Sequence, residues 1–196
     1  MAFPIRNRIA AAFASAALLT GACDNRHRGE ERAGREHAGE ELSVYDLGSK
    51  WQDQAGTART LGSLRGRPQV LALIYTNCTA ICPMTVSAMQ EVESKAGSAA
   101  GFVLVSMDPE RDSPARLAEY AKQRTLSPRW TLLSGDENAV RELAAVLGVK
   151  YRTVSPTEIV HTSTLTILDA NGRLAAQYSE TDAVDRAVRA LQRLPR

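Results

Sequence analysis

The chain lacks a strong charge of either sign, and it is poor in the side chains that bind metals. Its 196 residues include 24 basic and 22 acidic side chains, three histidines and three cysteines. The near balance of charge argues against a nucleic-acid footprint. The glycines form no phosphate-binding fingerprint, and Cys₄ or Cys₂His₂ spacing is absent. Composition therefore gives no indication of a nucleic-acid site, a nucleotide site or structural zinc.

The N-terminus has an apolar run, but this run is short. Residues 9–19 follow Arg6 and Arg8 and are too few for a comfortable membrane span. The segment LTGAC that ends at Cys23 resembles a bacterial lipobox, in which the cysteine is lipidated. We expect residues 1–22 to be a lipoprotein-type signal peptide and Cys23 to carry the lipid. An ordinary secretory signal is the alternative.

Residues 23–42 are dense in Arg, Glu, Gly and His and contain almost no apolar side chain. Such a segment cannot bury surface, so we expect a charged, flexible linker. About 20 flexible residues span roughly 25 Å. His27 and His37 lie in this linker, where solvated polarity is a simpler interpretation than metal capture. Residues 43–196 are long enough for one domain with its own core.

The domain alternates strand-like and helix-like segments. After short strands and turns over 43–47 and 51–61, the expected strands are 70–76, 102–107, 130–133, 164–169 and 174–178. The expected helices are 83–96, 136–147, 182–194 and one that starts at Ser113-Pro114 and continues through Leu117, Tyr120 and Ala121. Early β-α-β crossovers imply parallel pairing, and Asn171-Gly172 implies a late antiparallel hairpin. This order predicts an α/β, thioredoxin-like fold, with a mixed central sheet and helices on both faces.

Cys78 and Cys82 follow the expected strand 70–76, and Pro83 suits the first turn of a helix. This spacing lets two sulfurs lie on one face of a turn. A helix N-terminus favours the thiolate, which is both a nucleophile and a metal ligand. The pair is therefore a redox dithiol, a clip for a soft metal ion, or an inert disulfide of an exported protein.

His161 is the one histidine of residues 43–196, and it leads into the expected strand 164–169. If that strand is central in the sheet, its entry faces the start of the cysteine helix. Two thiolates and one imidazole would make a three-coordinate site that suits copper, particularly Cu(I). The alternative is a histidine that only hydrogen-bonds in the core or in a loop.

Three segments together resemble the Sco/SenC family of copper proteins. They are YTNCTAICP (75–83), SMDPERDSP (106–114) and HTS (161–163), and the resemblance covers about residues 43–194. It implies a thioredoxin-like protein that binds copper through Cys78, Cys82 and His161, as Cu(I) with Cu(II) as a further state. Many members carry an acidic residue where this chain has Ala80, a departure that bears on copper affinity and partner docking but removes no ligand.

Members of the family are tethered to a membrane and help to assemble the dinuclear copper A centre of cytochrome c oxidase. The resemblance thus implies a partner, the copper A-bearing subunit of that enzyme or a related copper enzyme. A lipid on Cys23 would replace the transmembrane anchor that is common in the family. The expected location is the bacterial periplasm or another extracytoplasmic face, at the inner membrane.

Other side chains near these motifs have two interpretations. The loop that contains Asp108, Pro109, Glu110 and Asp112 either supports the site or meets a partner, or it is only the turn before a helix capped by Ser113. The methionines at 84, 89 and 107 are soft donors, but their spacing favours core packing.

A copper metallochaperone, rather than an enzyme, is the leading hypothesis. The alternative is a thiol–disulfide oxidoreductase that keeps a partner's copper-site cysteines reduced. Such reductases usually have two residues between the cysteines and a facing proline, whereas this chain has three residues and Pro156 lies five residues before His161. A peroxidase is a third option, but the Thr-x-x-Cys motif is absent. The sequence leaves the oligomeric state open.

Overall fold

The computed structural model describes residues 42–155, 158–179 and 183–195. The predicted signal peptide, Cys23 and all but the last residue of the predicted linker lie outside the described residues, as do His27 and His37. Within the described part of the chain, no helix combines the length and the apolar character that a membrane crossing requires.

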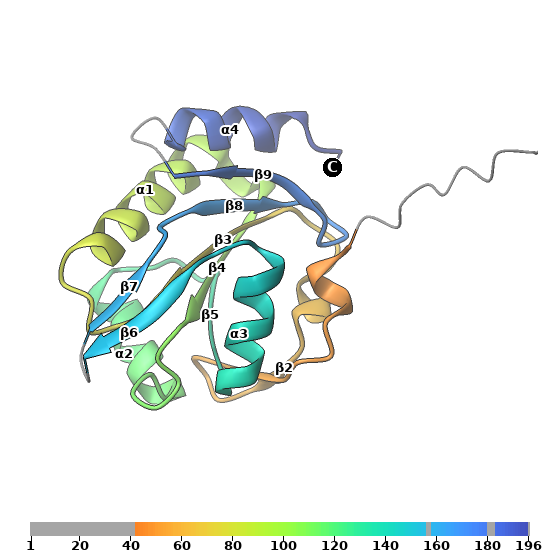
Figure 1. Cartoon of the computed structure of the whole chain (residues 1–196). Helices are drawn as coiled ribbons and strands as arrows, with labels where there is room; N and C mark the ends of the chain where they lie inside the picture. Colours follow the sequence, from red (N-terminus) through yellow and green to blue (C-terminus); the bar gives the residue numbers. More distant parts are fainter. Residues whose placement is uncertain (1–41, 156–157, 180–182, 196) are drawn as a thin grey trace, which may run out of the picture. The chain divides into compact units, whose positions relative to one another are not determined.

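A seven-stranded mixed sheet forms the centre of the fold (Figure 1). Its strand order is β2-β1-β5-β4-β3-β8-β9. The β3–β4 and β4–β5 pairs are parallel, and the other pairs are antiparallel. The strands are β1 (Trp51–Asp53), β2 (Ala58–Arg59), β3 (Gln69–Ile74), β4 (Gly101–Ser106), β5 (Trp130–Gly135), β8 (Leu165–Leu168) and β9 (Leu174–Tyr178). The predicted mixed sheet is confirmed.

Strands β3 and β4 lie in the middle of the sheet, and every residue of both strands is buried. This burial explains their nearly continuous apolar sequence, because a central strand covered on both faces has no solvent side. Strand β3 ends at Ile74, two residues before the predicted end. Tyr75 and Thr76 therefore belong to the loop that leads to Cys78.

The helices cover both faces of the sheet, as predicted. They are α1 (Ile81–Ala96), α2 (Pro114–Gln123), α3 (Glu137–Val146) and α4 (Ala183–Arg193). Figure 1 shows α1 beside α4, with α3 on the opposite face of the sheet. The two right-handed crossovers β3–α1–β4 and β4–α2–β5 step in the same direction, which places α2 on the face of α1.

The predicted starts of α2 and α3 are explained by the side chains that cap them. Ser113 accepts a hydrogen bond from the Arg116 N–H at 3.3 Å, and Asp136 accepts one from the Ala139 N–H at 2.8 Å. Short 3₁₀ helices occupy other connections, namely η1 (Val44–Asp46), η2 (Leu61–Leu64) and η3 (Gly97–Ala99). Helix α1 begins two residues before Pro83, which still lies in the first turn, where its missing N–H removes no helical bond.

A second, two-stranded sheet was not predicted from the sequence. Strands β6 (Tyr151–Ser155) and β7 (Glu158–His161) form an antiparallel hairpin. The residues of these strands are mostly exposed, and Ile159 is the buried one. Such a hairpin has no apolar run to reveal it. His161 is the last residue of β7, so it lies on this hairpin rather than in a simple loop before β8.

Candidate metal centre

Cys78 and Cys82 lie at the N-terminus of α1. Cys78 is 9% exposed, Cys82 is fully buried, and both thiols are free. The N-cap residue Ala80 offers no side chain to the first N–H groups of the helix. The sulfur of Cys78 takes that place, because it accepts a hydrogen bond from the Cys82 N–H at 3.3 Å. The four-residue spacing thus turns the first cysteine into a cap for the helix that carries the second.

The hairpin brings His161 to the second cysteine. Its Nε2 lies 3.6 Å from the Cys82 Sγ, and its Nδ1 lies 3.2 Å from the Thr162 carbonyl oxygen. A carbonyl only accepts, so this contact assigns the proton to Nδ1 and leaves the Nε2 lone pair facing the sulfur. The expected approach of the imidazole to the thiol pair is therefore seen at Cys82.

Cys78, Cys82 and His161 lie near one another, but their donor atoms do not yet form a three-donor site. Within residues 42–155, 158–179 and 183–195, no three His, Cys, Asp or Glu side chains are grouped closely enough to hold a metal ion. Cys82 contacts both other candidates, Cys78 through its backbone N–H and His161 through its sulfur. A small movement of side chains or of the hairpin is needed before all three donors can meet at one point.

The two thiols differ in acidity. Burial opposes ionisation of Cys78, but hydrogen bonds from the Cys82 N–H and thiol and from the N–H groups that follow Cys78 outweigh it, so the pKa of Cys78 lies below its usual value. Burial raises the pKa of Cys82 to about 12, and the nearby Cys78 sulfur and Asp112 carboxylate add to this rise. Cys78 is thus the readily ionised thiol.

Burial also lowers the pKa of His161, although the Thr162 carbonyl partly offsets this effect. The imidazole is therefore neutral near pH 7. A neutral imidazole and an ionisable thiol are the forms in which these side chains bind metals, and a soft ion would also displace the proton of Cys82. This donor set fits copper.

The predicted acidic loop divides into two parts. Asp112 is fully buried, and its carboxylate accepts hydrogen bonds from the Thr76 N–H at 3.0 Å, the Thr76 hydroxyl at 2.5 Å and the Ser106 hydroxyl at 2.6 Å. It therefore anchors the segment just before Cys78. Asp108 pairs with Arg111 at 2.9 Å.

The remaining residues of this loop face the β6–β7 hairpin. Pro109 and Glu110 line a pocket of about 290 Å³ with Asp108, and residues of the β6–β7 hairpin form its other wall. The loop thus lies between the end of β4 and the hairpin that carries His161.

Tyr75 and Thr85 contact the segment around His161, and neither was singled out from the sequence. The Tyr75 hydroxyl accepts the Ile159 N–H at 3.4 Å, and the Tyr75 ring meets the His161 ring edge-on, with 6.2 Å between centroids. The Thr85 hydroxyl lies 2.7 Å from that of Ser163. A signal was present for Tyr75, since a tyrosine at the end of a buried strand needs a partner for its hydroxyl.

The methionines behave mainly as predicted. Met89 and Met107 are buried in the core, whereas Met84 is 68% exposed on the first turns of α1. Met84 lines a shallow groove with Ile81, on the helix face that looks toward Ser163.

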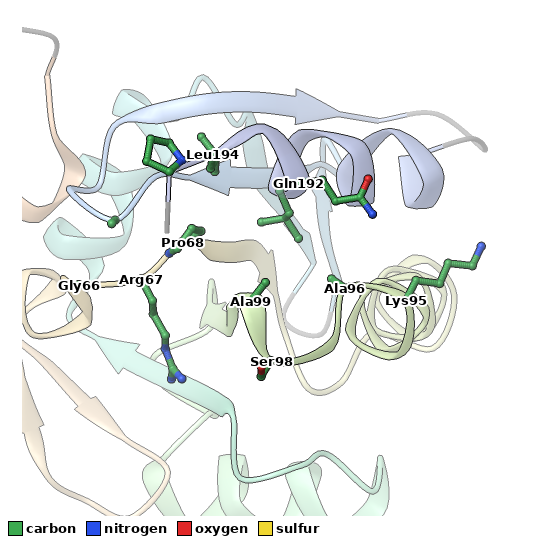
Figure 2. A pocket seen from close by; sticks show the side chains of 12 residues that line it. Gly66, Arg67, Pro68, Lys95, Ala96, Ser98, Ala99, Gln192 and Leu194 are labelled. Atoms are coloured by element: carbon green, nitrogen blue, oxygen red, sulfur yellow. The ribbon is translucent and has the colours of Figure 1, made fainter.

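A pocket of about 390 Å³ lies at the ends of β3 and α1 that are opposite to the thiols (Figure 2). It is formed around Gly66–Pro68, which precede β3, and the last residues of α1, whereas the cysteines follow β3 and begin α1. Figure 2 shows Arg67 and Lys95 pointing in different directions, away from a common centre. Lys95 is already paired with Glu91 and Asp185. This pocket offers no convergent set of polar groups.

Comparison with known proteins places these features in context. The SCO1/SenC family model matches residues 41–196. The chain is 27% identical to Bradyrhizobium japonicum ScoI with copper bound, with a TM-score of 0.65 over 75% of this chain and 97% of that one. Against curated relatives from Bacillus subtilis and Rickettsia conorii, at 27% identity, the match spans 70% and 65% of their lengths.

Two further solved structures share the fold. A SCO1/SenC family lipoprotein from Bacillus anthracis is 22% identical, with a TM-score of 0.70 over 77% of this chain and 95% of that one. BsSco, described as a member of the Sco family of cytochrome c oxidase assembly proteins with a disulfide switch, is 23% identical, with a TM-score of 0.65 over 79% of this chain and 97% of that one. These likenesses agree with a thioredoxin-like fold.

Proposed function

Because the chain belongs to the SCO1/SenC family, whose solved members include copper-bound proteins, we propose that it carries copper between Cys78, Cys82 and His161 and hands the ion to a copper enzyme. The observation that carries this proposal is the 3.6 Å approach of His161 Nε2 to Cys82 Sγ. It joins two donors that lie on different structural elements and far apart in the sequence.

The donor chemistry supports a transferable ion. Two sulfurs and one imidazole nitrogen suit Cu(I), and a three-coordinate ion leaves room for an incoming ligand. Cys78 ionises readily and retains some exposure, so it is the donor that an incoming ligand replaces first. Cys82 and His161 then hold the ion until the recipient's donors complete its coordination. Cu(II) is a further oxidation state that this site would hold.

The family relationship supports the recipient. BsSco belongs to a family of cytochrome c oxidase assembly proteins. By extension, the proposed partner is the copper A-bearing subunit of cytochrome c oxidase or a related copper enzyme. We also propose that a lipid on Cys23 anchors the chain to the inner membrane on its periplasmic or other extracytoplasmic side. The Bacillus anthracis lipoprotein, which shares the fold, supports this anchoring.

The thiol–disulfide oxidoreductase hypothesis is less favoured. The comparisons point to copper-bound proteins, and His161 stands against Cys82, where a metal ligand is needed. Disulfide reduction of a general substrate such as insulin separates the two functions. Rapid turnover that survives His161→Ala would favour the reductase.

Copper titration of the full chain in detergent tests the proposal. We expect one Cu(I) per chain, measured by competition with a chromophoric chelator and by metal analysis. Cys78→Ser, Cys82→Ser and His161→Ala should each weaken Cu(I) binding by about 100-fold or more, since loss of even an outer-shell partner costs about 10–100-fold.

The matched control is His37→Ala, which removes a histidine of the predicted linker and should leave affinity and stoichiometry unchanged. If His161→Ala binds Cu(I) as tightly as the unaltered chain, the three-donor site is wrong.

A further inference from the structure

Two residues of the segment that carries the thiols contact the chain just before and just after His161. Tyr75 lies three residues before Cys78, and Thr85 lies three residues after Cys82. The Tyr75 hydroxyl contacts Ile159, two residues before His161. The Thr85 hydroxyl contacts Ser163, two residues after His161. The imidazole is thus bracketed by two hydroxyl contacts from the cysteine segment.

We propose that Tyr75 and Thr85 are positioning residues that dock the His161 segment onto the thiol pair. This inference rests on the proposed copper site and assigns a role to two side chains that would not themselves bind the ion.

The Tyr75 side chain is well placed for this role because its backbone is fixed. Its carbonyl accepts the Cys78 N–H at 3.2 Å, and the next residue, Thr76, is held by the buried Asp112. The ring is 6% exposed, so the phenol cannot swing into solvent without opening the site. Its hydroxyl accepts the Ile159 N–H at 3.4 Å, which is long for an amide donor and therefore a weak tie.

The Thr85 contact has a defined direction. The Thr85 hydroxyl donates to the Ile81 carbonyl at 3.1 Å, so in the 2.7 Å contact it accepts the hydrogen of the Ser163 hydroxyl. Both threonine bonds start from the first turns of α1, the helix that contains Cys82. The connection after His161 is therefore held by the same rigid element as the second sulfur.

The hairpin is not part of the main sheet, so the Tyr75 and Thr85 hydroxyl contacts help to hold it in position. Strands β6 and β7 pair only with each other in the sheet topology, and the hairpin buries Ile159 against the core. Besides the two hydroxyl contacts, the hairpin packs against the core through Ile159 and the half-buried Tyr151, and His161 itself contacts Cys82 and the Tyr75 ring. A histidine that must meet two sulfurs gains from being held on both sides.

Tyr75→Phe and Ser163→Ala test this inference, because each removes one hydroxyl and little else. In the metal-free full chain, Tyr75→Phe should speed hydrogen exchange of the Ile159 amide roughly 2- to 10-fold, the range expected for one hydrogen bond. With Cu(I) bound, each variant should release the ion to a chelator roughly 3- to 10-fold faster, and the double variant should exceed either. The His161 ring proton resonances should shift in both variants.

Matched controls are Tyr45→Phe, a buried tyrosine whose hydroxyl has no hydrogen-bond partner among the described residues, and Ser94→Ala, an exposed serine of α1. Both should leave Cu(I) release and the His161 resonances unchanged. If the double variant keeps the release rate and the His161 resonances of the unaltered chain, the docking role is wrong while the copper site stands. If the unaltered chain binds no Cu(I), the proposed function fails whatever the exchange data give.

Discussion

At the scale of single residues, the two cysteines differ in their affinity for a proton although only three residues separate them. Cys78 precedes the helix. Its sulfur accepts hydrogen bonds from free N–H groups at the helix start, and these bonds stabilise a thiolate. Cys82 is inside the helix and fully buried, so its charged form loses solvation. Position relative to the helix start therefore decides which sulfur is charged before an ion arrives.

This difference predicts selective alkylation. Iodoacetamide reacts with thiolates, so in the metal-free chain Cys78 should be modified as pH rises through a pKa below its ordinary value of 9.0. Cys82, whose pKa is about 12, should remain unmodified over the same range. Mass spectrometry of the two cysteine-containing peptides measures both.

Unfolding in urea is the control, since both thiols should then react alike. Equal modification of Cys78 and Cys82 in the folded chain would show that the helix N-terminus does not distinguish them.

The sequence predicted the donor residues better than their surroundings. Cys78 and Cys82 are recognisable because their spacing matches one helical turn, and His161 because it has no competitor in the domain. Tyr75 and Thr85 were missed because neither residue type by itself points to a metal site. Their roles follow only from long-range contacts with Ile159 and Ser163, which no local pattern encodes.

At the scale of elements, the site depends on how β3, the loop after β4 and the β6–β7 hairpin meet. The two central strands were predictable because their burial on both faces demands an apolar run. The hairpin was not, because most residues of β6 and half of those of β7 are polar, and a strand that buries one residue gives no periodic signal. The element that positions the histidine is thus the one that sequence patterns describe least.

The loop after β4 yields a prediction at this scale. Asp112→Asn keeps the shape of the side chain but replaces one accepting oxygen by a donor, next to the fixed Thr76 N–H and two hydroxyl donors. We expect the free energy of unfolding to fall by about 1–3 kcal/mol, the cost of a buried polar group left without its partner. Urea denaturation followed by circular dichroism measures this change.

Glu110→Gln provides the comparison, because it makes the same chemical change on an exposed residue of the same loop. It should alter the free energy of unfolding by less than about 0.5 kcal/mol. Equal effects of the two substitutions would remove Asp112 as the anchor of the segment before Cys78.

At the scale of the whole molecule, two regions lie at opposite ends of β3 and α1. The thiols lie after β3 and at the start of α1, while the pocket of Figure 2 lies before β3 and at the end of α1. Only the first region combines an ionisable thiol, a buried thiol and a neutral imidazole. The proposed transfer of copper therefore takes place at the end of the domain formed by the start of α1 and the hairpin.

X-ray absorption spectroscopy at the copper edge of the Cu(I)-loaded chain tests the central claim most directly. The account predicts two sulfur atoms and one imidazole nitrogen at bonding distance from copper, with the imidazole contribution lost in His161→Ala and retained in His37→Ala. A copper environment without imidazole, or one whose imidazole signal survives His161→Ala, would contradict it.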